Sequence, residues 1–372
     1  MSTKISILFD SYYLYHLPQF EPLIKLLSTD KRFSIYHSTS KEISKQEFEL
    51  CKTILKKKHG TFIEAENETE RQKKIRGLNL NVFICGWSRY DISKYVTSKT
   101  LVVMIYHGIG IKPSYWLDNH ERIDLRMVEG PYRIEQLRNY GVKTDLALTG
   151  FIKLDPLFQN IVEKTDLIKK SYNFDKNKKT ILFAPTFYPS SVEPIGMKLG
   201  EYTKRYNVLI KPHLWTTFLN KFAELNHEPK RKIFKNLEKT YKHIYLIPPE
   251  NYNIIPFYKL SDLLLTEASS TIYEMLACNK PVIVNRFFKL KLSHRIFKQR
   301  LYKKRLNHEM EDDITNFCYE AKTPKELPNL FTDAFKDSKL KMHNIKEHQE
   351  KMLYKLDGLA SERAKKEILN RL

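Results

Sequence analysis

The chain has 372 residues, and its 64 Lys and Arg against 43 Asp and Glu give a formal net charge of +21. Apolar residues make up 42% and charged residues 29%, which excludes wholesale disorder and suits two domains, each with its own core. The positive charge predicts an anionic partner: nucleic acid, an anionic membrane surface or a phosphorylated substrate.

Short apolar runs alternate with amphipathic stretches along most of the chain, as expected for parallel strands covered on both faces by helices. In the first half, strands are expected at 5–9, 33–36, 82–85, 101–105, 125–128 and 146–148, and helices at 18–27, 45–58 and 136–140. In the second half, strands are expected at 180–183, 208–210, 243–246, 263–266 and 282–285, and helices at 197–206 and 271–278. This repeated pattern predicts the α/β class, with charged helices near the C-terminus.

The domain boundary is expected near residues 164–179, whose polar, basic end at 171–179 is typical of a linker. We therefore predict one Rossmann-like domain at 1–165 and a second Rossmann-like domain at 175–345. A C-terminal helix is expected at 346–372. Two doubly wound domains facing a cleft are the simplest arrangement, and such sheets bind ligands beyond the carboxyl ends of their strands.

Several classes of protein lose their usual support. The four cysteines form no C-x-x-C pair, so neither a zinc ribbon nor a disulfide framework is indicated. No P-loop, G-x-G-x-x-G, H-E-x-x-H or G-x-S-x-G motif occurs, and neither a metal nor a cofactor is expected. The longest apolar runs reach about a third of the roughly 20 residues that span a bilayer, so we expect a cytoplasmic protein.

Candidate site residues of the first half follow predicted strands. His107 comes directly after the strand at 101–105, and a histidine there can act as a general base. Gly108 allows close backbone approach, and Lys112 makes the following loop basic. His16, in an aromatic loop after the first strand, is a further candidate for contact with a substrate.

Candidates of the second half also lie at strand ends. Lys211 and His213, in a Lys-Pro-His motif, suit a phosphate leaving group, and Thr186 could donate its hydroxyl to one. A capping box is predicted from Thr271 to Glu274. Helix capping alone would also explain the hydroxyls before it, but such a helix start can bind an anion as well.

Six short motifs follow one another along residues 100–290. They are His-Gly at 107–108, Thr-Gly-Phe-Ile-Lys-Leu-Asp at 149–155, Ala-Pro-Thr at 184–186, Lys-Pro-His at 211–213, Ser-Asp-Leu-Leu-Leu-Thr-Glu-Ala-Ser-Ser at 261–270 and Asn-Lys-Pro-Val-Ile at 279–283. In this order they resemble the CDP-glycerol glycerophosphotransferase family, which builds teichoic acids and related poly(glycerol phosphate) chains. The resemblance implies a glycosyltransferase-B-like fold with the nucleotide donor held mainly by the second domain.

The same resemblance implies roles for individual residues. His107 would deprotonate the acceptor hydroxyl and His213 would stabilise or protonate the departing phosphate. The donor would be bound by Lys211, Thr186, Glu267, Ser269, Ser270 and Thr271, and the acceptor side would include Gly108, Lys112 and His16. Where the family commonly has Asp-Tyr-Ser-Ser, this chain has Glu267-Ala268-Ser269-Ser270, which leaves the donor open.

The implied function is transfer of glycerol phosphate from CDP-glycerol to a hydroxyl of a lipid-linked teichoic-acid-like or capsular acceptor. A glycosyltransferase using a nucleotide sugar, or a CDP-ribitol enzyme, is the alternative, and a basic nucleic-acid-binding protein is the remote one. The segment 286–305 has nine Lys and Arg, no acid and interleaved apolar residues. It is typical of a helix on an anionic membrane, although an ordinary basic surface helix has the same pattern. The expected location is therefore peripheral, at the inner face of the cell membrane.

Overall fold

A computed structural model of the chain describes residues 4–110, 112–159, 172, 174–219, 221–222, 225–336 and 342–372. It divides into two compact units. The first unit comprises residues up to Gly108, Tyr115–Gln159 and Glu350–Leu372, and the second comprises Ile109–Ser114 and Asn160–Gln349. Each unit is an α/β domain with its own parallel sheet, which confirms the predicted class.

The first unit is built on a seven-stranded parallel sheet in the order β3-β2-β1-β4-β5-β6-β7. The central strands are buried on both faces, as their continuous apolar sequences predict. Six of the seven strands were predicted; β3 was missed because it has only two residues. The strands are β1 Ile5–Asp10, β2 Phe33–Ser38, β3 Thr61–Phe62, β4 Val82–Cys85, β5 Leu101–Ile105, β6 Leu125–Val128 and β7 Asp145–Leu148.

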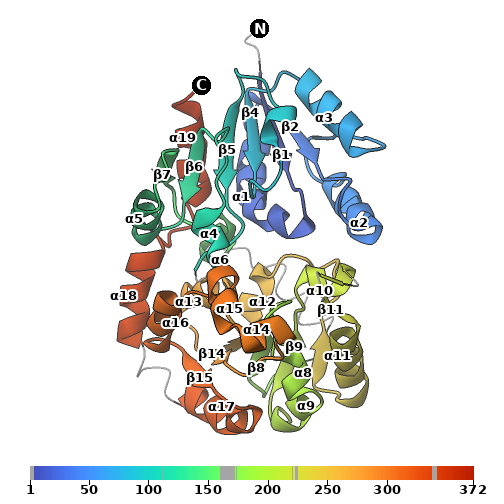
Figure 1. Cartoon of the computed structure of the whole chain (residues 1–372), viewed down its shortest axis with the longest axis vertical. Helices are drawn as coiled ribbons and strands as arrows, with labels where there is room; N and C mark the ends of the chain where they lie inside the picture. Colours follow the sequence, from blue (N-terminus) through green and yellow to red (C-terminus); the bar gives the residue numbers. More distant parts are fainter. Residues whose placement is uncertain are drawn as a thin grey trace. The chain divides into compact units, whose positions relative to one another are not determined.

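Helices flank this sheet, with α5 beside β6 and β7 and with α1 packed against α19 (Figure 1). Their starts follow local rules, since the side chains of Ser44 and Asn67 cap α2 and α3, and a proline begins α5. The helices are α1 Leu17–Ser28, α2 Lys45–Leu55, α3 Glu68–Gly77, α4 Ser114–Leu117, α5 Pro131–Asn139, α6 Asp155–Phe158 and α19 Ala360–Leu369, with short 3-10 turns at Leu14–His16, Ile92–Lys94 and Ile152–Leu154.

The second unit contains a six-stranded parallel sheet in the order β12-β9-β8-β13-β14-β15. Its first five strands in chain order match the predicted ones, and β15 was missed because it is short and partly polar. The strands are β8 Thr180–Phe183, β9 Asn207–Ile210, β12 Ile244–Leu246, β13 Leu263–Thr266, β14 Val282–Asn285 and β15 Tyr319–Ala321, and Lys221–Phe222 (β10) and Leu225–Asn226 (β11) form a separate antiparallel pair.

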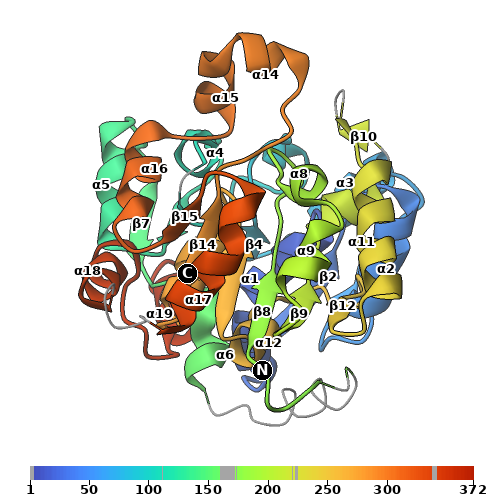
Figure 2. The ribbon, with the colours of Figure 1, turned by 90° about the horizontal axis from the view of Figure 1, so that it is seen from below.

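Two groups of helices cover this sheet (Figure 2). Helices α8, α9 and α11 lie beside β8, β9 and β12, and α17 packs on β14 and β15, so that one apolar core runs beneath the sheet. The helices are α8 Val192–Ile195, α9 Lys198–Tyr202, α10 Leu214–Phe218, α11 Glu228–Thr240, α12 Ile255–Leu260, α13 Thr271–Leu276, α14 Leu292–Ile296, α15 Lys298–Lys304, α16 His308–Thr315, α17 Leu327–Lys336 and α18 Met342–Met352, with a 3-10 turn at Pro324–Glu326.

The expected single helix at 286–305 is wrong. Residues 286–291 are non-helical, and Lys289 pairs with Ser190 in an isolated antiparallel bridge. Helix α14 then ends before Phe297, whose φ of −110° and ψ of 74° break the helix ahead of α15. The bridge to a distant loop fixes the start of the segment in an extended conformation, which the local sequence does not reveal.

The C-terminal stretch also differs from the single helix expected at 346–372. Helix α18 ends at Met352, residues 353–359 are non-helical and α19 begins at Ala360. Most of the expected boundary at 164–179 lies outside the described residues, so the predicted domain limits stay predictions. Within the described part of the chain, no helix is long and apolar enough to cross a membrane. Nor do its His, Cys, Asp and Glu residues form any group of three suited to a metal ion.

Candidate functional site

His107 stands at the carboxyl end of β5, where the backbone fixes the protonation of its ring. Its Nδ1 is 3.0 Å from the carbonyl oxygen of Gly86. A carbonyl only accepts hydrogen bonds, so Nδ1 carries the proton and Nε2 is the basic nitrogen of the neutral ring. The backbone oxygen of His107 accepts a hydrogen bond of 2.9 Å from Gln19 Nε2. His107 therefore has the tautomer that a general base needs.

His16 lies beside His107, with 4.9 Å between the ring centroids, and its side chain is completely buried. The rings of Tyr13, Tyr15 and Trp87 surround it. Burial, followed by the charge of neighbouring groups, holds the pKa of His16 well below its usual range, so the ring is neutral. His16 thus exposes no surface that an acceptor could contact. Its ring instead packs against the ring of His107.

Position 108 has no room for a side chain because an aromatic ring occupies the space beside the Gly108 backbone. A Cβ at this position would lie 2.9 Å from the Tyr115 ring. Tyr115 in turn contacts Tyr106, whose hydroxyl donates to Asp118 at 2.8 Å. The glycine at position 108 therefore lets the His-Gly turn close against an aromatic wall.

His213 begins α10 in the second unit, just after β9. Its Nδ1 accepts a hydrogen bond of 3.1 Å from the backbone N–H of Trp215, so the neutral ring carries its proton on Nε2. Phe187 packs on this ring with 5.0 Å between centroids, and Lys211, two residues earlier, is buried. His213 thus has the opposite tautomer to His107 and is a hydrogen-bond donor at Nε2.

Thr186 and Glu267 shape the loop beside His213. The Glu267 carboxylate is completely buried and accepts from the backbone N–H groups of Thr186 at 2.6 Å and Ser191 at 2.8 Å. Burial raises the pKa of Glu267, and these hydrogen bonds oppose the rise. The Thr186 hydroxyl donates to the carbonyl oxygen of Pro189. Both residues were predicted to bind the donor, and the contacts seen here make them positioning residues of the 184–191 loop.

The predicted capping box at Thr271 is wrong. Helix α13 begins at Thr271, its N-cap is Ser270, and the Ser270 side chain makes no capping hydrogen bond. The Glu274 carboxylate is buried and accepts a hydrogen bond of 2.9 Å from the Tyr258 hydroxyl instead. Ser269 and Ser270 are partly exposed at the carboxyl end of β13, and their proposed contact with the donor stays a prediction.

Lys112 was expected on the acceptor side, but the structure groups it with the second unit. Its Nζ lies 5.8 Å from the centroid of the Phe187 ring, and the Arg305 guanidinium lies 5.2 Å from the same centroid. Sequence reasoning missed both Phe187 and Arg305. Phe187 directly follows the Ala-Pro-Thr motif and could have been suspected, whereas Arg305 was indistinguishable from the other cations of its segment.

The motif at 149–155 anchors the C-terminal helix. The Asp155 carboxylate accepts from the backbone N–H groups of Ala360 at 3.0 Å and Ser361 at 2.8 Å, which begin α19. Gly150 has a φ of +88°, and a Cβ there would lie 2.5 Å from a backbone oxygen. Thr149 accepts a hydrogen bond of 2.6 Å from Arg363 at its backbone oxygen. This motif is therefore structural.

Residues 107–370 match the family described as CDP-glycerol:poly(glycerophosphate) glycerophosphotransferase. The chain belongs to this family. The match begins at His107 and covers well over half of the sequence. It confirms the expected resemblance and identifies a glycerophosphotransferase that transfers glycerol phosphate from CDP-glycerol.

Solved structures similar to this glycerophosphotransferase support the fold. The wall teichoic acid polymerase TagF has 14% identity and a TM-score of 0.69, over 98% of this chain and 88% of that one. A histidine-to-asparagine variant of TagF soaked with CDPG has 13% identity and a TM-score of 0.68, over 99% and 89%. S. aureus MnaA in complex with UDP has 15% identity and a TM-score of 0.62, over 99% and 98%. No curated protein matches the chain.

Proposed function

We propose that this glycerophosphotransferase acts on a hydroxyl of a lipid-linked teichoic-acid-like or capsular acceptor, with His107 as the general base and His213 as the donor to the leaving group. The observation that carries the proposal is the pair of opposite tautomers. Gly86 places the proton of His107 on Nδ1, and the Trp215 N–H places that of His213 on Nε2. One ring is thereby set to accept a proton and the other to donate a hydrogen bond.

The reaction follows from these assignments. His107 Nε2 takes the proton of the acceptor hydroxyl. The oxygen of that hydroxyl forms a bond to the phosphorus that carries glycerol. The bond from this phosphorus to the bridging oxygen breaks, and CMP leaves with its phosphate hydrogen-bonded to His213 Nε2–H. Such phosphoryl transfer depends on positioning and charge neutralisation more than on covalent catalysis.

Residues of the second unit would bind the donor in this scheme. Lys211 supplies a buried positive charge next to His213, and Ser269, Ser270 and Thr271 offer hydroxyl and N–H groups at the end of β13. Glu267 and Thr186 act indirectly by fixing the 184–191 loop. A nucleotide sugar or CDP-ribitol would need the same diphosphate contacts, so the donor must be tested directly.

The test is a transfer assay with CDP-glycerol and a lipid-linked polyol-phosphate acceptor. We expect His107→Ala and His213→Ala each to lower kcat about 10²- to 10⁴-fold, since general acid–base groups contribute this much. His59→Ala, at an exposed histidine of the first unit, is the matched control and should leave the rate unchanged. Wild-type rates in either folded active-site variant would contradict its role.

A thermal-shift panel settles the donor, because a ligand that binds the folded state raises the melting temperature. CDP-glycerol should stabilise the wild-type protein more than CDP-ribitol, CMP-Kdo, UDP-sugars or GDP-sugars at equal concentration. A larger shift with a nucleotide sugar would favour the glycosyltransferase alternative.

We further propose that the protein binds the cytoplasmic membrane surface through the segment 286–305. Three apolar side chains in α14 and at the break that follows it are strongly exposed: Leu292 at 67%, Ile296 at 63% and Phe297 at 52%. Basic residues surround them, and no acid occurs in the segment. Exposed apolar residues within a basic segment favour an anionic lipid surface.

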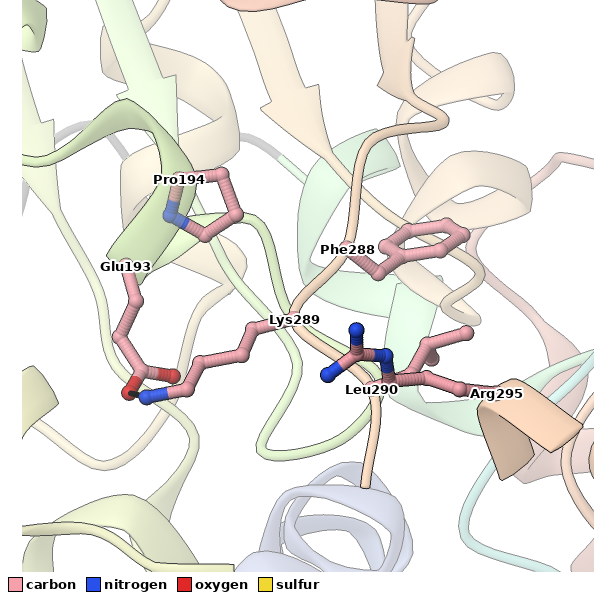
Figure 3. A pocket seen from close by; sticks show the side chains of 6 residues that line it. All are labelled: Glu193, Pro194, Phe288, Lys289, Leu290 and Arg295. Carbon is pink, nitrogen blue, oxygen red and sulfur yellow. Dashed lines mark hydrogen bonds and ion pairs between the residues drawn. The ribbon is translucent and has the colours of Figure 1, made fainter. Parts of the chain in front are cut away.

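A pocket of about 560 Å³ opens next to this segment (Figure 3). Lys289 pairs with Glu193 at 2.7 Å on one side, and the Arg295 guanidinium lies near Leu290 on the other. With Phe288 and Pro194 also in its lining, the pocket combines positive charge with apolar walls. This combination supports contact with the interfacial region of a membrane.

Vesicle sedimentation tests the membrane proposal. The triple variant Leu292→Ser, Ile296→Ser and Phe297→Ser should bind phosphatidylglycerol vesicles at least tenfold more weakly than the wild type, because it loses the apolar surface that would enter the membrane. The control triple variant Leu117→Ser, Tyr140→Ser and Leu359→Ser removes three apolar side chains of the first unit that are each at least half exposed. Equal binding of the two variants would contradict the proposal.

A further inference from the structure

The Phe187 ring is the centre of a cluster of groups that can carry positive charge. The ring is 5% exposed and packs against His213 and Trp215, with centroids 5.0 and 4.9 Å away. Lys112 Nζ and the Arg305 guanidinium approach the same ring at 5.8 and 5.2 Å. The cluster draws on segments nearly 200 residues apart: the loop after β5, the start of α10 and the end of α15.

The two cations repel one another. Burial and then the charge of Arg305 lower the pKa of Lys112 to about 8, while the carboxylate of Glu267 opposes this effect. Glu267 is already bound to the N–H groups of Thr186 and Ser191. The Phe187 ring offers both cations a favourable quadrupole, and an anion bound by both would offset their repulsion.

We propose that Lys112 and Arg305, held over Phe187 beside His213, form the subsite for the diphosphate of the nucleotide donor. The inference rests on the proposed function of His213. The planar guanidinium of Arg305 suits two phosphate oxygens at once, and Lys112 adds a compact charge. The His213 Nε2–H would contact the phosphate that departs.

This assignment divides the segment 286–305 by function. Arg305 and the buried His294 belong to the side that contacts the donor loop, since His294 Nδ1 lies 2.7 Å from the Tyr188 hydroxyl. Leu292, Ile296 and Phe297 belong to the exposed side. Figure 2 shows α14 and α15 projecting together from the second unit, and the chain then continues from α15 to α16. The positive charge of this segment thus serves two different anions.

Calorimetric titration with CDP-glycerol, inorganic pyrophosphate and cytidine tests the subsite. Arg305→Gln and Lys112→Gln should each weaken binding of CDP-glycerol and pyrophosphate roughly 10- to 100-fold, as expected for lost charge-assisted hydrogen bonds. Cytidine affinity should stay the same. Arg300→Gln removes a charge from the exposed side of α15, where Arg300 stacks on Phe297, and should change no affinity more than about twofold.

Arg305→Lys keeps the charge but loses the planar geometry, so it should recover part of the lost affinity, and it replaces Arg305→Gln if that variant unfolds. Wild-type affinity for pyrophosphate and CDP-glycerol in both glutamine variants would overturn the subsite, as would a wild-type protein that binds no diphosphate. If the wild type binds a UDP-sugar in place of CDP-glycerol and Arg305→Gln weakens that binding, the result supports the diphosphate subsite and contradicts CDP-glycerol as the donor.

Discussion

The two histidines show how the backbone assigns different chemistry to one residue type. His107 donates from Nδ1 to a carbonyl group, and His213 accepts at Nδ1 from an N–H group. The His-Gly and Lys-Pro-His motifs predict a histidine at each strand end, but the sequence gives no indication of the tautomer. The partner atoms come from Gly86, 21 residues away in one case, and from the next turn of chain in the other.

At the same scale, the pH dependence of donor binding should report on Lys112. Its pKa is about 8 in the free protein, and a bound diphosphate favours the protonated amine, so affinity should fall as the pH rises past 8. Arg305 and Glu267 face this amine, and Lys230, which donates to the Phe187 carbonyl at 2.7 Å, lies nearby. The measurement is CDP-glycerol affinity between pH 6.5 and about 9.5.

Lys112→Gln keeps all of these neighbours, and His213 as well, so the difference between its curve and that of the wild type isolates Lys112. The two curves should approach one another as the pH rises from about 8 towards the upper end of this range. Parallel curves over the whole range would show that Lys112 does not contact the bound anion.

Glu267 provides a second prediction for a single residue. Glu267→Gln leaves one carboxylate position as an amide NH₂, which faces the N–H groups of Thr186 or Ser191 in place of an acceptor. We expect the free energy of unfolding to fall by about 1–3 kcal/mol, the cost of a buried donor without a partner. Chemical denaturation measures this change, and the exposed Glu201→Gln in α9 is the control. Equal stability of the two variants would contradict the positioning role of Glu267.

At the scale of elements, long-range contacts decide what the motifs do. The segment 286–305 is bridged to the 184–191 loop at Ser190 and hydrogen-bonded to it at Tyr188. The bridge holds the start of the segment in an extended conformation, and the backbone angles of Phe297 separate α14 from α15, so this basic, amphipathic sequence does not form one continuous helix. Similarly, the motif at 149–155 contributes no group to the candidate site described above and instead receives α19.

The contact of Asp155 with α19 leads to a prediction for that helix. Asp155→Ala removes the acceptor for the first N–H groups of α19, so we expect a loss of about 1–3 kcal/mol in unfolding free energy. Hydrogen exchange at residues 360–369 should increase as well. Asp333→Ala, at an exposed position of α17 in the second unit, should change neither quantity. Unchanged exchange in α19 of Asp155→Ala would show that other contacts, such as those with α1, are sufficient.

For the whole molecule, the division into two units leads to a prediction about where the donor binds. The proposed donor groups, Lys112 and Arg305 included, belong to the second unit. Adding CDP-glycerol should therefore slow hydrogen exchange mainly at 184–191, 211–218 and 266–276. Protection confined to the strands of the first unit would place the donor there and contradict the assignment.

Local sequence was sufficient for much of the fold. Eleven predicted strands are present because buried parallel strands are continuously apolar, as in Val82–Cys85 and Leu263–Thr266. The strands at Thr61–Phe62 and Tyr319–Ala321 were missed because two or three residues carry no periodicity. The predicted capping box at Thr271 is absent because the Glu274 carboxylate accepts a hydrogen bond from the Tyr258 hydroxyl, which comes from the preceding helix α12.

The sequence by itself therefore determined the α/β class, the strand ends where His107 and His213 stand, and the family. Each depends on residues close together in the chain. Only the tertiary structure decided which histidine nitrogen carries the proton, that Glu267 holds a loop, and that Lys112 and Arg305 meet at Phe187. Hydrogen bonds and charge–charge contacts act through space. Apart from the N–H group two residues after His213, the partners here lie from 21 to nearly 200 positions apart, which no local pattern records.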